Sequence, residues 1–196
     1  MGTLRLVLAS ASPRRVELMR ESGWVFETVV SGVEELEFHP EGPEALALEN
    51  ARRKWESIAA IRPQDMVVSA DTVVWMDGDF YAKPRDLTHA RKMLGTLSGK
   101  THKVVTGVFC GRKNQSRSLF AETSHVTFHA LSPAAIEDYI GLVNPLDKAG
   151  GYAAQGEGGK IISRLEGSLT NVIGLPIERL SAELLRLGMQ PQSRHV

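Results

Sequence analysis

Residues 6–15 read Leu6-Val7-Leu8-Ala9-Ser10-Ala11-Ser12-Pro13-Arg14-Arg15. The apolar run predicts a buried strand, and the small residues after it predict a tight loop that turns directly into a helix. Ser12 suits the N-cap of that helix, and Pro13 suits its first position, where a missing N–H costs nothing. Helix N-termini favour anions, and guanidinium groups match phosphate oxygens. The stretch therefore predicts a strand–loop–helix unit that binds a phosphate group.

Strand and helix patterns alternate along the rest of the chain. Apolar and β-branched runs predict strands at 5–10, 25–31, 66–76, 79–82, 101–112, 118–129 and 160–165. Helical spacing and capping residues predict helices at 13–21, 43–61, 87–97, 133–142 and 175–188. The polar run Ser69-Ala70-Asp71-Thr72 is expected to interrupt the strand at 66–76. Early alternation followed by a long antiparallel pair predicts an α/β fold with a mixed sheet.

Composition narrows the class of protein. The 196 residues include 23 basic and 23 acidic side chains, and this balance argues against a polyanionic partner such as nucleic acid. No apolar run approaches the length of a membrane span, and no signal peptide pattern is present. Cys110 is the single cysteine and lies in an apolar strand, which predicts a core thiol and a cytoplasmic protein. We expect one domain over residues 1–190 and a disordered tail over 191–196.

Several common sites lack support in the sequence. Residues 95–101 imitate a phosphate-binding P-loop, but they have one residue too few between the glycines and join a helix to a strand. No GxGxxG follows a predicted strand, which removes a dinucleotide fold. A single cysteine without HExxH disfavours zinc, and no GxSxG nucleophile motif exists.

Three charged residues have two readings each. Asp71 stands inside an apolar strand, where it either reaches water at an edge or bulge, or acts as a base or metal ligand. Lys83 precedes Pro84 and is held extended, either in solvent or toward a phosphate. Lys54 lies on a helix beside Trp55, where a surface position is the more common outcome.

Two loops also have two readings each. Glu34 and Glu35 belong to an acidic loop that either is solvated or folds over a site and supplies a magnesium ligand. Residues 150–156 form a glycine-rich segment that is either a mobile surface loop or a loop beside a ligand. In the second case Gln155 supplies an amide that pairs with the carbonyl and N–H edge of uracil or thymine.

Taken in order, these segments resemble the Maf family from Leu6 to about Leu187. The matching motifs are Ser10-Ala11-Ser12-Pro13-Arg14-Arg15, Glu34-Glu35, Lys54, Ala70-Asp71-Thr72, Lys83-Pro84, Ser98-Gly99-Lys100-Thr101-His102, Tyr152-Ala153-Ala154-Gln155-Gly156 and Asn171-Val172-Ile173-Gly174-Leu175-Pro176. The resemblance implies a fold like that of inosine triphosphate pyrophosphatases, with a long twisted mixed sheet between two lobes and a central cleft. It also implies a nucleoside triphosphate pyrophosphatase that needs a divalent cation, Mg²⁺ or Mn²⁺.

The resemblance assigns roles to matching residues. Asp71 and Lys83 take catalytic positions, with Asp71 as the proton acceptor, and Glu35 and Asp71 take metal-binding positions. Substrate-binding positions fall on Ser10, Arg14, Arg15, Lys54, Thr72 and Gln155. Trp55 departs from the family, which usually has a small residue there, so its ring either shifts Lys54 or fills the core.

Within the family, the motifs resemble the branch that hydrolyses dTTP and UTP, for which modified pyrimidine triphosphates are further candidate substrates. The resemblance ties substrate choice to Arg15, Thr72 and Gln155. The 7-methyl-GTP branch tends to have Trp in place of Arg14, Gln in place of Thr72 and Ser-Glu in place of Gln155, and none of these appears here. The alternatives are a 7-methyl-GTP pyrophosphatase and a non-catalytic nucleotide-binding regulator of cell division. A homodimer is expected from the family.

Overall fold

The computed structural model describes residues 4–191. The helices are α1 (Pro13–Glu21), α2 (Pro43–Ile61), α3 (Leu87–Leu97), α4 (Pro133–Leu142), η1 (Ala149–Gly151), η2 (Gly156–Ile161), α5 (Leu169–Ile173) and α6 (Ile177–Arg186). The strands are β1 (Leu6–Leu8), β2 (Glu27–Thr28), β3 (Met66–Met76), β4 (Asp79–Phe80), β5 (Thr101–Gly111), β6 (Arg117–Phe128) and β7 (Ile162–Glu166). No helix of this described part is long and apolar enough to cross a membrane. Of the tail expected at 191–196, residues 192–196 lie outside it.

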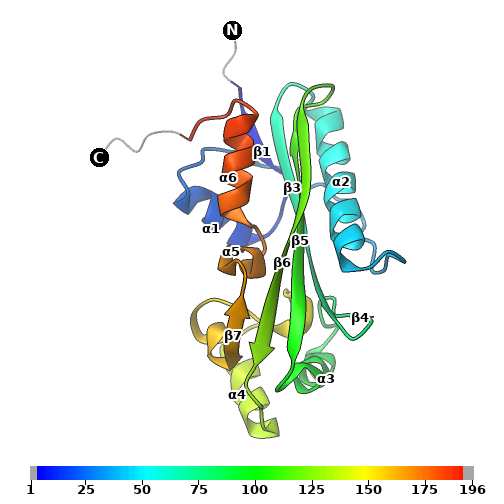
Figure 1. Ribbon diagram of the computed structural model, residues 1–196, viewed down its shortest axis with the longest axis vertical. Coiled ribbons are helices and arrows are strands. Elements are labelled where there is room, and N and C mark those ends of the chain that lie inside the picture. Colours follow the sequence, from blue (N-terminus) through cyan, green and yellow to red (C-terminus); the bar gives the residue numbers. More distant parts are fainter. Residues whose placement is uncertain (1–3, 192–196) are drawn as a thin grey trace.

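A mixed sheet runs the length of the molecule (Figure 1). Within residues 4–191 it has seven strands in the order β2-β1-β3-β5-β6-β7, with β4 paired to β3. β1 is parallel to both of its neighbours, β2 and β3. The pairs β3–β5, β5–β6 and β6–β7 are antiparallel. The expected α/β class with a long mixed sheet is therefore confirmed.

The expected interruption of β3 is wrong, because the strand is continuous over Met66–Met76. Each polar side chain in its middle has a partner. The Ser69 hydroxyl donates to the carbonyl of Ala51, Asp71 bonds to side chains of α2, and Thr72 bonds to Arg15. Hydrogen-bonded polar groups can be buried at little cost, so the strand needs no break.

Helices cover the two faces of the sheet separately (Figure 1). On one face, Val7 and Val67 pack with Trp55 and Ile58 of α2. On the other face, Leu8 and Val68 belong to a larger core with residues of α1 and α6. A third core at the far end joins β3, β5 and β6 to α3 and α4. The sheet thereby connects two lobes, one around α1, α5 and α6 and the other around α3 and α4.

Several expected boundaries differ from the structure. β1 and β2 are shorter than the predicted strands, and β7 begins at Ile162, after a 3-10 turn over Gly156–Ile161. α5 was not expected, and Ser168 caps it by accepting the backbone N–H of Asn171. Ser12 occupies the predicted N-cap position of α1, but its side chain makes no cap; instead its N–H donates to Ser10 Oγ at 3.1 Å.

Gly107 sets the closest approach between α2 and the sheet. It lies in β5 directly opposite Asp71 of β3. A Cβ at this position would lie 2.4 Å from the backbone carbonyl of Ala47 in α2 and 2.6 Å from Leu48 N. Backbone atoms cannot yield as a flexible side chain does, so α2 rests on the sheet only because residue 107 has no side chain.

We expect Gly107→Ala to lower the free energy of unfolding by roughly 1–3 kcal/mol, because it overpacks a backbone contact. Gly95→Ala is the matched control, since a Cβ there meets nothing within 4 Å and Gly95 lies inside α3. The control should gain about 0.5–1 kcal/mol, because alanine favours a helix over glycine. Urea denaturation of both variants measures the difference. Equal stability of the two would contradict the close approach.

Candidate active site

One cavity of about 370 Å³ lies beside β3 where β1 has ended. All nine residues expected from the sequence line it: Ser10, Arg14, Arg15, Glu35, Lys54, Asp71, Thr72, Lys83 and Gln155. They come from segments far apart in the chain and from both lobes. The structure therefore assembles the whole predicted set around a single space.

The shortness of β1 makes this assembly possible. Its last backbone contact to β3 is from Ala9 N to Val68 O, and Tyr81 N and β4 pair with β3 only from Val74 on, so the edge of β3 is open over residues 70–73. The carbonyl of Ala70 accepts Arg15 Nη1 at 2.9 Å and Lys54 Nζ at 3.4 Å. Because this edge is open, side chains from opposite faces of the sheet reach one cavity.

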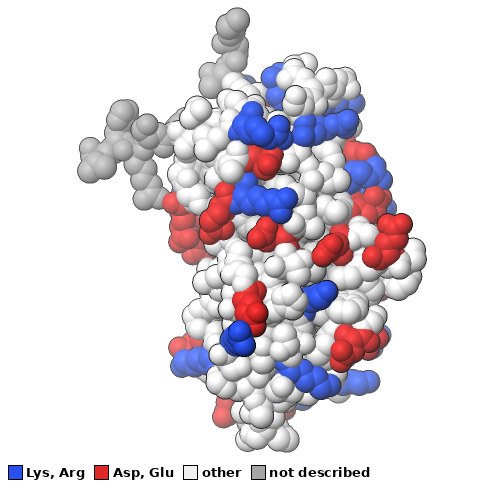
Figure 2. Space-filling view, in the orientation of Figure 1, with Lys and Arg blue, Asp and Glu red and all other residues white. Residues whose placement is uncertain are grey.

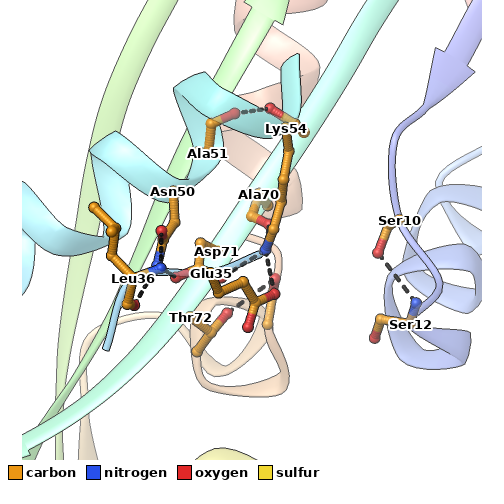
Figure 3. A network of polar contacts seen from close by, with 12 residues as sticks. Ser10, Ser12, Glu35, Leu36, Asn50, Ala51, Lys54, Ala70, Asp71 and Thr72 are labelled. Atoms are coloured by element: carbon orange, nitrogen blue, oxygen red, sulfur yellow. Dashed lines mark hydrogen bonds and ion pairs between the residues drawn. The ribbon is translucent and has the colours of Figure 1, made fainter. Parts of the chain in front are cut away.

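Asp71 and Lys54 form the buried polar centre of the site (Figure 3). Asp71 is only 6% exposed and Lys54 only 7%, and Lys54 Nζ lies 2.7 Å from Asp71 Oδ1. The expectation that Lys54 more commonly lies at the surface is wrong, and Asp71 borders the cavity with only a small part of its surface exposed. Each charge is compensated by the other, which is what makes their burial possible.

Glu35 joins the same lysine from the loop before α2. Its Oε1 lies 2.6 Å from Lys54 Nζ, so two carboxylates converge on one ammonium (Figure 3). Burial raises the pKa of Glu35, but Lys54, Lys83 and Arg15 outweigh that effect and hold the pKa below its ordinary value. Glu35 is therefore ionised at neutral pH and lines the cavity.

Asn50 is a member of this network that the sequence analysis missed. Asn50 lies in α2 and its side chain is almost fully buried. Its Nδ2 donates to Asp71 Oδ2 at 3.0 Å (Figure 3). A usable signal was present, because Asn50 shares one helical face with Leu46, Ala47 and Ala51. A polar side chain on such an apolar stripe needs a buried partner.

Of the two expectations for Trp55, the one in which its ring fills the core is confirmed. Its ring packs on Phe109 with centroids 4.5 Å apart, and its Nε1 donates to the carbonyl of Gly111. It points away from the cavity lining, so the neighbouring Lys54 keeps its place.

The two arginines of the first motif differ in what they bind. Arg15 donates to the carbonyls of Gly174 and Ala70 and to Thr72 Oγ1, at 2.7, 2.9 and 3.0 Å. It thereby ties α1 to β3 and to the turn after α5. Burial lowers the pKa of Arg15, and the charges of Asp71 and Glu35 oppose that effect.

Arg14 instead reaches across the cavity. Its Nη1 lies 3.3 Å from Asp147 Oδ2, and the other oxygen of Asp147 lies 2.5 Å from Lys148 Nζ. Asp147 and Lys148 also line the cavity and were not predicted. The exposed Lys83 completes the basic lining, in which the cations Arg14, Arg15, Lys54, Lys83 and Lys148 outnumber the carboxylates Glu35, Asp71 and Asp147.

Gln155 lies exposed at the tip of a loop whose base is closed by Tyr139. Tyr139 Oη accepts the N–H of Ala153 at 3.0 Å and donates to the carbonyl of Gly158 at 3.4 Å. A Cβ at Gly158 would lie 2.6 Å from the Ala153 carbonyl oxygen, so the two ends of the loop are in contact. The base of this loop is therefore held by hydrogen bonds and backbone contact, whereas its tip at Gln155 is exposed.

The lining can bind a polyanion and a small cation. Its excess of cations suits phosphate oxygens, whereas Glu35 and Asp71 supply the hard oxygen ligands that Mg²⁺ takes together with phosphate. Within residues 4–191 no group of three or more His, Cys, Asp or Glu could hold a metal by itself. On the face drawn in Figure 2, acidic and basic side chains are intermingled, without an extended basic surface.

Comparisons with known proteins point to one family. Residues 5–187 match the family described as Maf-like protein. The dTTP/UTP pyrophosphatase of Salmonella typhimurium is 42% identical over 173 residues, covering 88% of this chain and 87% of that protein. The dTTP/UTP pyrophosphatase of Anaeromyxobacter dehalogenans is 42% identical over 189 residues, covering 94% of both.

Two solved structures share the fold. A HAM1 protein from Coxiella burnetii aligns with a TM-score of 0.53 at 13% identity, covering 94% of this chain and 100% of that one. The Ham1 protein of Staphylococcus aureus aligns with a TM-score of 0.51 at 14% identity, covering 91% and 99%. The expected fold is confirmed by these likenesses.

We expect buried His102 to make the protein less stable in acid. Burial lowers its pKa to about 4 from 6.5, and its Nε2 lies 2.8 Å from Tyr152 Oη beneath the Gln155 loop. Between these values the unfolded chain binds the proton and the folded chain does not. Stability therefore falls as the pH drops from 6.5 to 4, by about 3 kcal/mol in total.

Urea denaturation across this pH range measures the effect. His102→Gln should flatten the dependence, whereas substitution of the exposed His125 by glutamine should leave it unchanged. An equally steep loss in His102→Gln would assign the acid sensitivity to another group.

Proposed function

This chain belongs to the Maf family, and we propose that it hydrolyses dTTP and UTP to the nucleoside monophosphate and pyrophosphate. The curated relatives that carry this activity in their names match most of the chain. The observation that carries the proposal is the buried Asp71, paired with Lys54 and Asn50 at a cavity with an excess of cations. Modified pyrimidine triphosphates, which share the base edge, are further candidate substrates.

Asp71 would orient and deprotonate the attacking water. A carboxylate within reach of a water can take its proton, and such catalysis contributes about 10²–10⁴-fold in rate. Its Oδ1 bonds to Lys54 and its Oδ2 to Asn50, so the carboxylate is held in one orientation before the substrate binds. Fixed orientation lowers the entropy that must be lost in the transition state.

Glu35 and Asp71 would hold the divalent cation together with oxygens of the triphosphate. The fit rests on the convergence of both carboxylates on Lys54 Nζ, at 2.6 and 2.7 Å, which places two oxygen ligands close together. When bound, Mg²⁺ or Mn²⁺ supplies positive charge that stabilises the phosphate oxygens.

The basic residues would bind the phosphates. Arg14 and Lys83 lie at the cavity surface and would hold the departing pyrophosphate, on which negative charge increases during cleavage. Ser10 and the start of α1 would contact the phosphates from the other side. Arg15 donates hydrogen bonds to Thr72 and to the carbonyl of Gly174. Arg15 and Thr72 would therefore contribute to substrate binding by fixing the edge of β3 and the turn at Gly174 beside the base.

Gln155 would read the base. Uracil and thymine present a carbonyl beside an N–H, and one glutamine amide pairs with both groups. A base that leaves these polar groups unpaired in a closed site is rejected strongly.

We expect Asp71→Asn to fold and to lose about 10²–10⁴-fold in kcat, because asparagine cannot accept the proton. Pyrophosphate release from dTTP with Mg²⁺ measures the loss, and circular dichroism checks the fold. Asp65→Asn is the control, since Asp65 pairs with Arg62 and lies outside the cavity lining. Activity near that of the parent protein in Asp71→Asn would exclude Asp71 as the base.

We expect Gln155→Ala to lower kcat/KM for dTTP and UTP about tenfold and to change ATP and GTP little, because one base-specific contact is lost. Glu157→Ala is the control, since Glu157 is exposed on the same loop but outside the cavity lining. An unchanged ranking of bases would place recognition elsewhere.

The same panel tests the alternatives. Preference of the parent protein for 7-methyl-GTP would assign it to the other branch of the family. Tight nucleotide binding without turnover would instead indicate a regulator.

A further inference from the structure

Asn50 makes hydrogen bonds in two directions from the middle of α2. Its Nδ2 donates to Asp71 Oδ2 at 3.0 Å and to the carbonyl of Leu36 at 2.9 Å. Its Oδ1 accepts the N–H of Leu36 at 2.8 Å. The side chain is 2% exposed, so these partners satisfy both amide hydrogens and the amide oxygen inside the protein.

Leu36 follows Glu35 in a loop that has little other support. Residues 32–40 contain neither helix nor strand, and residues 34–38 are exposed. The Asn50 amide forms hydrogen bonds with both the N–H and the carbonyl of Leu36, as the backbone of a neighbouring strand would. The segment also has the Glu35–Lys54 ion pair and an edge contact of Phe38 with Phe80, and His39 accepts the N–H groups of Glu41 and Gly42 at its end. Just before it, Ser57 Oγ donates to the carbonyl of Ser31.

The amide thus connects the two carboxylates that converge on Lys54. One comes from a loop and the other from β3, and Asn50 bonds to the residue beside Glu35 and to Asp71 itself (Figure 3). An ion pair alone tolerates many geometries, whereas a planar amide with three hydrogen bonds fixes direction as well as distance.

We propose that Asn50 is a positioning residue that sets the Glu35–Asp71 carboxylate pair for a divalent cation before the nucleotide arrives. The inference rests on the proposed function, because it deepens the role given there to this pair. Leucine at position 50 would suit the apolar face of α2, but it would release the loop and leave Asp71 Oδ2 without its donor. Preorganised ligands bind a metal more tightly than ligands that must first be ordered.

The test compares Asn50→Leu with Ser57→Ala. Ser57→Ala removes a hydrogen bond from the same helix to the same loop without touching Asp71, and Ser57 is outside the cavity lining. Asn50→Ala is a second variant that cannot clash. Thermal unfolding confirms that each variant is folded.

Two readouts do not depend on turnover. The first is the affinity for Mn²⁺ in the absence of nucleotide. It is measured by titration, with the free Mn²⁺ quantified from its electron paramagnetic resonance signal. The second is cleavage of the native protein by a glutamate-specific protease at Glu34, Glu35 and Glu37, located by mass spectrometry.

For Asn50→Leu and Asn50→Ala we expect a 10- to 100-fold weaker Mn²⁺ affinity, the usual effect of removing a partner of a metal ligand. We also expect roughly tenfold faster loop cleavage, because a locally released segment is cut more readily. Ser57→Ala should keep the Mn²⁺ affinity of the parent protein.

Parental Mn²⁺ affinity in both Asn50 variants would overturn the inference, even where pyrophosphate release by the parent protein supports the proposed function. Equal loss of affinity in Ser57→Ala would also overturn it, because any loosening of the loop would then suffice. Absence of pyrophosphate release from the parent protein with each nucleotide would instead contradict the proposed function.

Discussion

The close packing of α2 on the sheet at Gly107 is the constraint on which the site depends. Gly107 faces Asp71 across β3 and β5, and the backbone of Ala47 occupies the space that any side chain there would need. This contact brings α2 near enough for Asn50 and Lys54 to reach Asp71 directly. A larger residue would separate the helix from the strand and leave a buried carboxylate without partners, which is costly. Stability and the arrangement of the site therefore depend on the same missing side chain.

The second constraint is the early end of β1. A longer strand would pair with β3 beyond Val68 and cover the edge at which the carbonyl of Ala70 meets Arg15 and Lys54. With that edge open, Asp71 points to the α2 side and Thr72 to the α1 side, yet both border one cavity. Neighbouring residues in a strand normally serve opposite faces, so this use of both requires an exposed edge. The ion pair of Arg14 with Asp147 then joins the two lobes across the same cavity.

Much of the fold could be predicted from the sequence because its signals are local. Helix α2 and the pair β5–β6 follow from apolar spacing, and Asp86 caps α3 as expected, by accepting the N–H of His89. The errors arose where a distant partner overrides local preference. β3 continues through a polar run because groups of α2 form hydrogen bonds with its side chains. The short α5 forms because the Ser168 hydroxyl caps it and Ile173 packs in the core, which together offset the low stability of so short a helix.

The sequence by itself determined nine residues that line one cavity, since the motifs carry chemistry at recognisable positions, but it missed Asn50, Asp147 and Lys148. Only the tertiary structure decided what each residue contacts. Lys54 is buried because two carboxylates neutralise it, Arg15 binds backbone carbonyls, and Asn50 links Asp71 to the loop of Glu35. Such pairings depend on distances between segments far apart in the chain. Residue type and local spacing do not encode those distances; the packing of α2, β1 and β3 sets them.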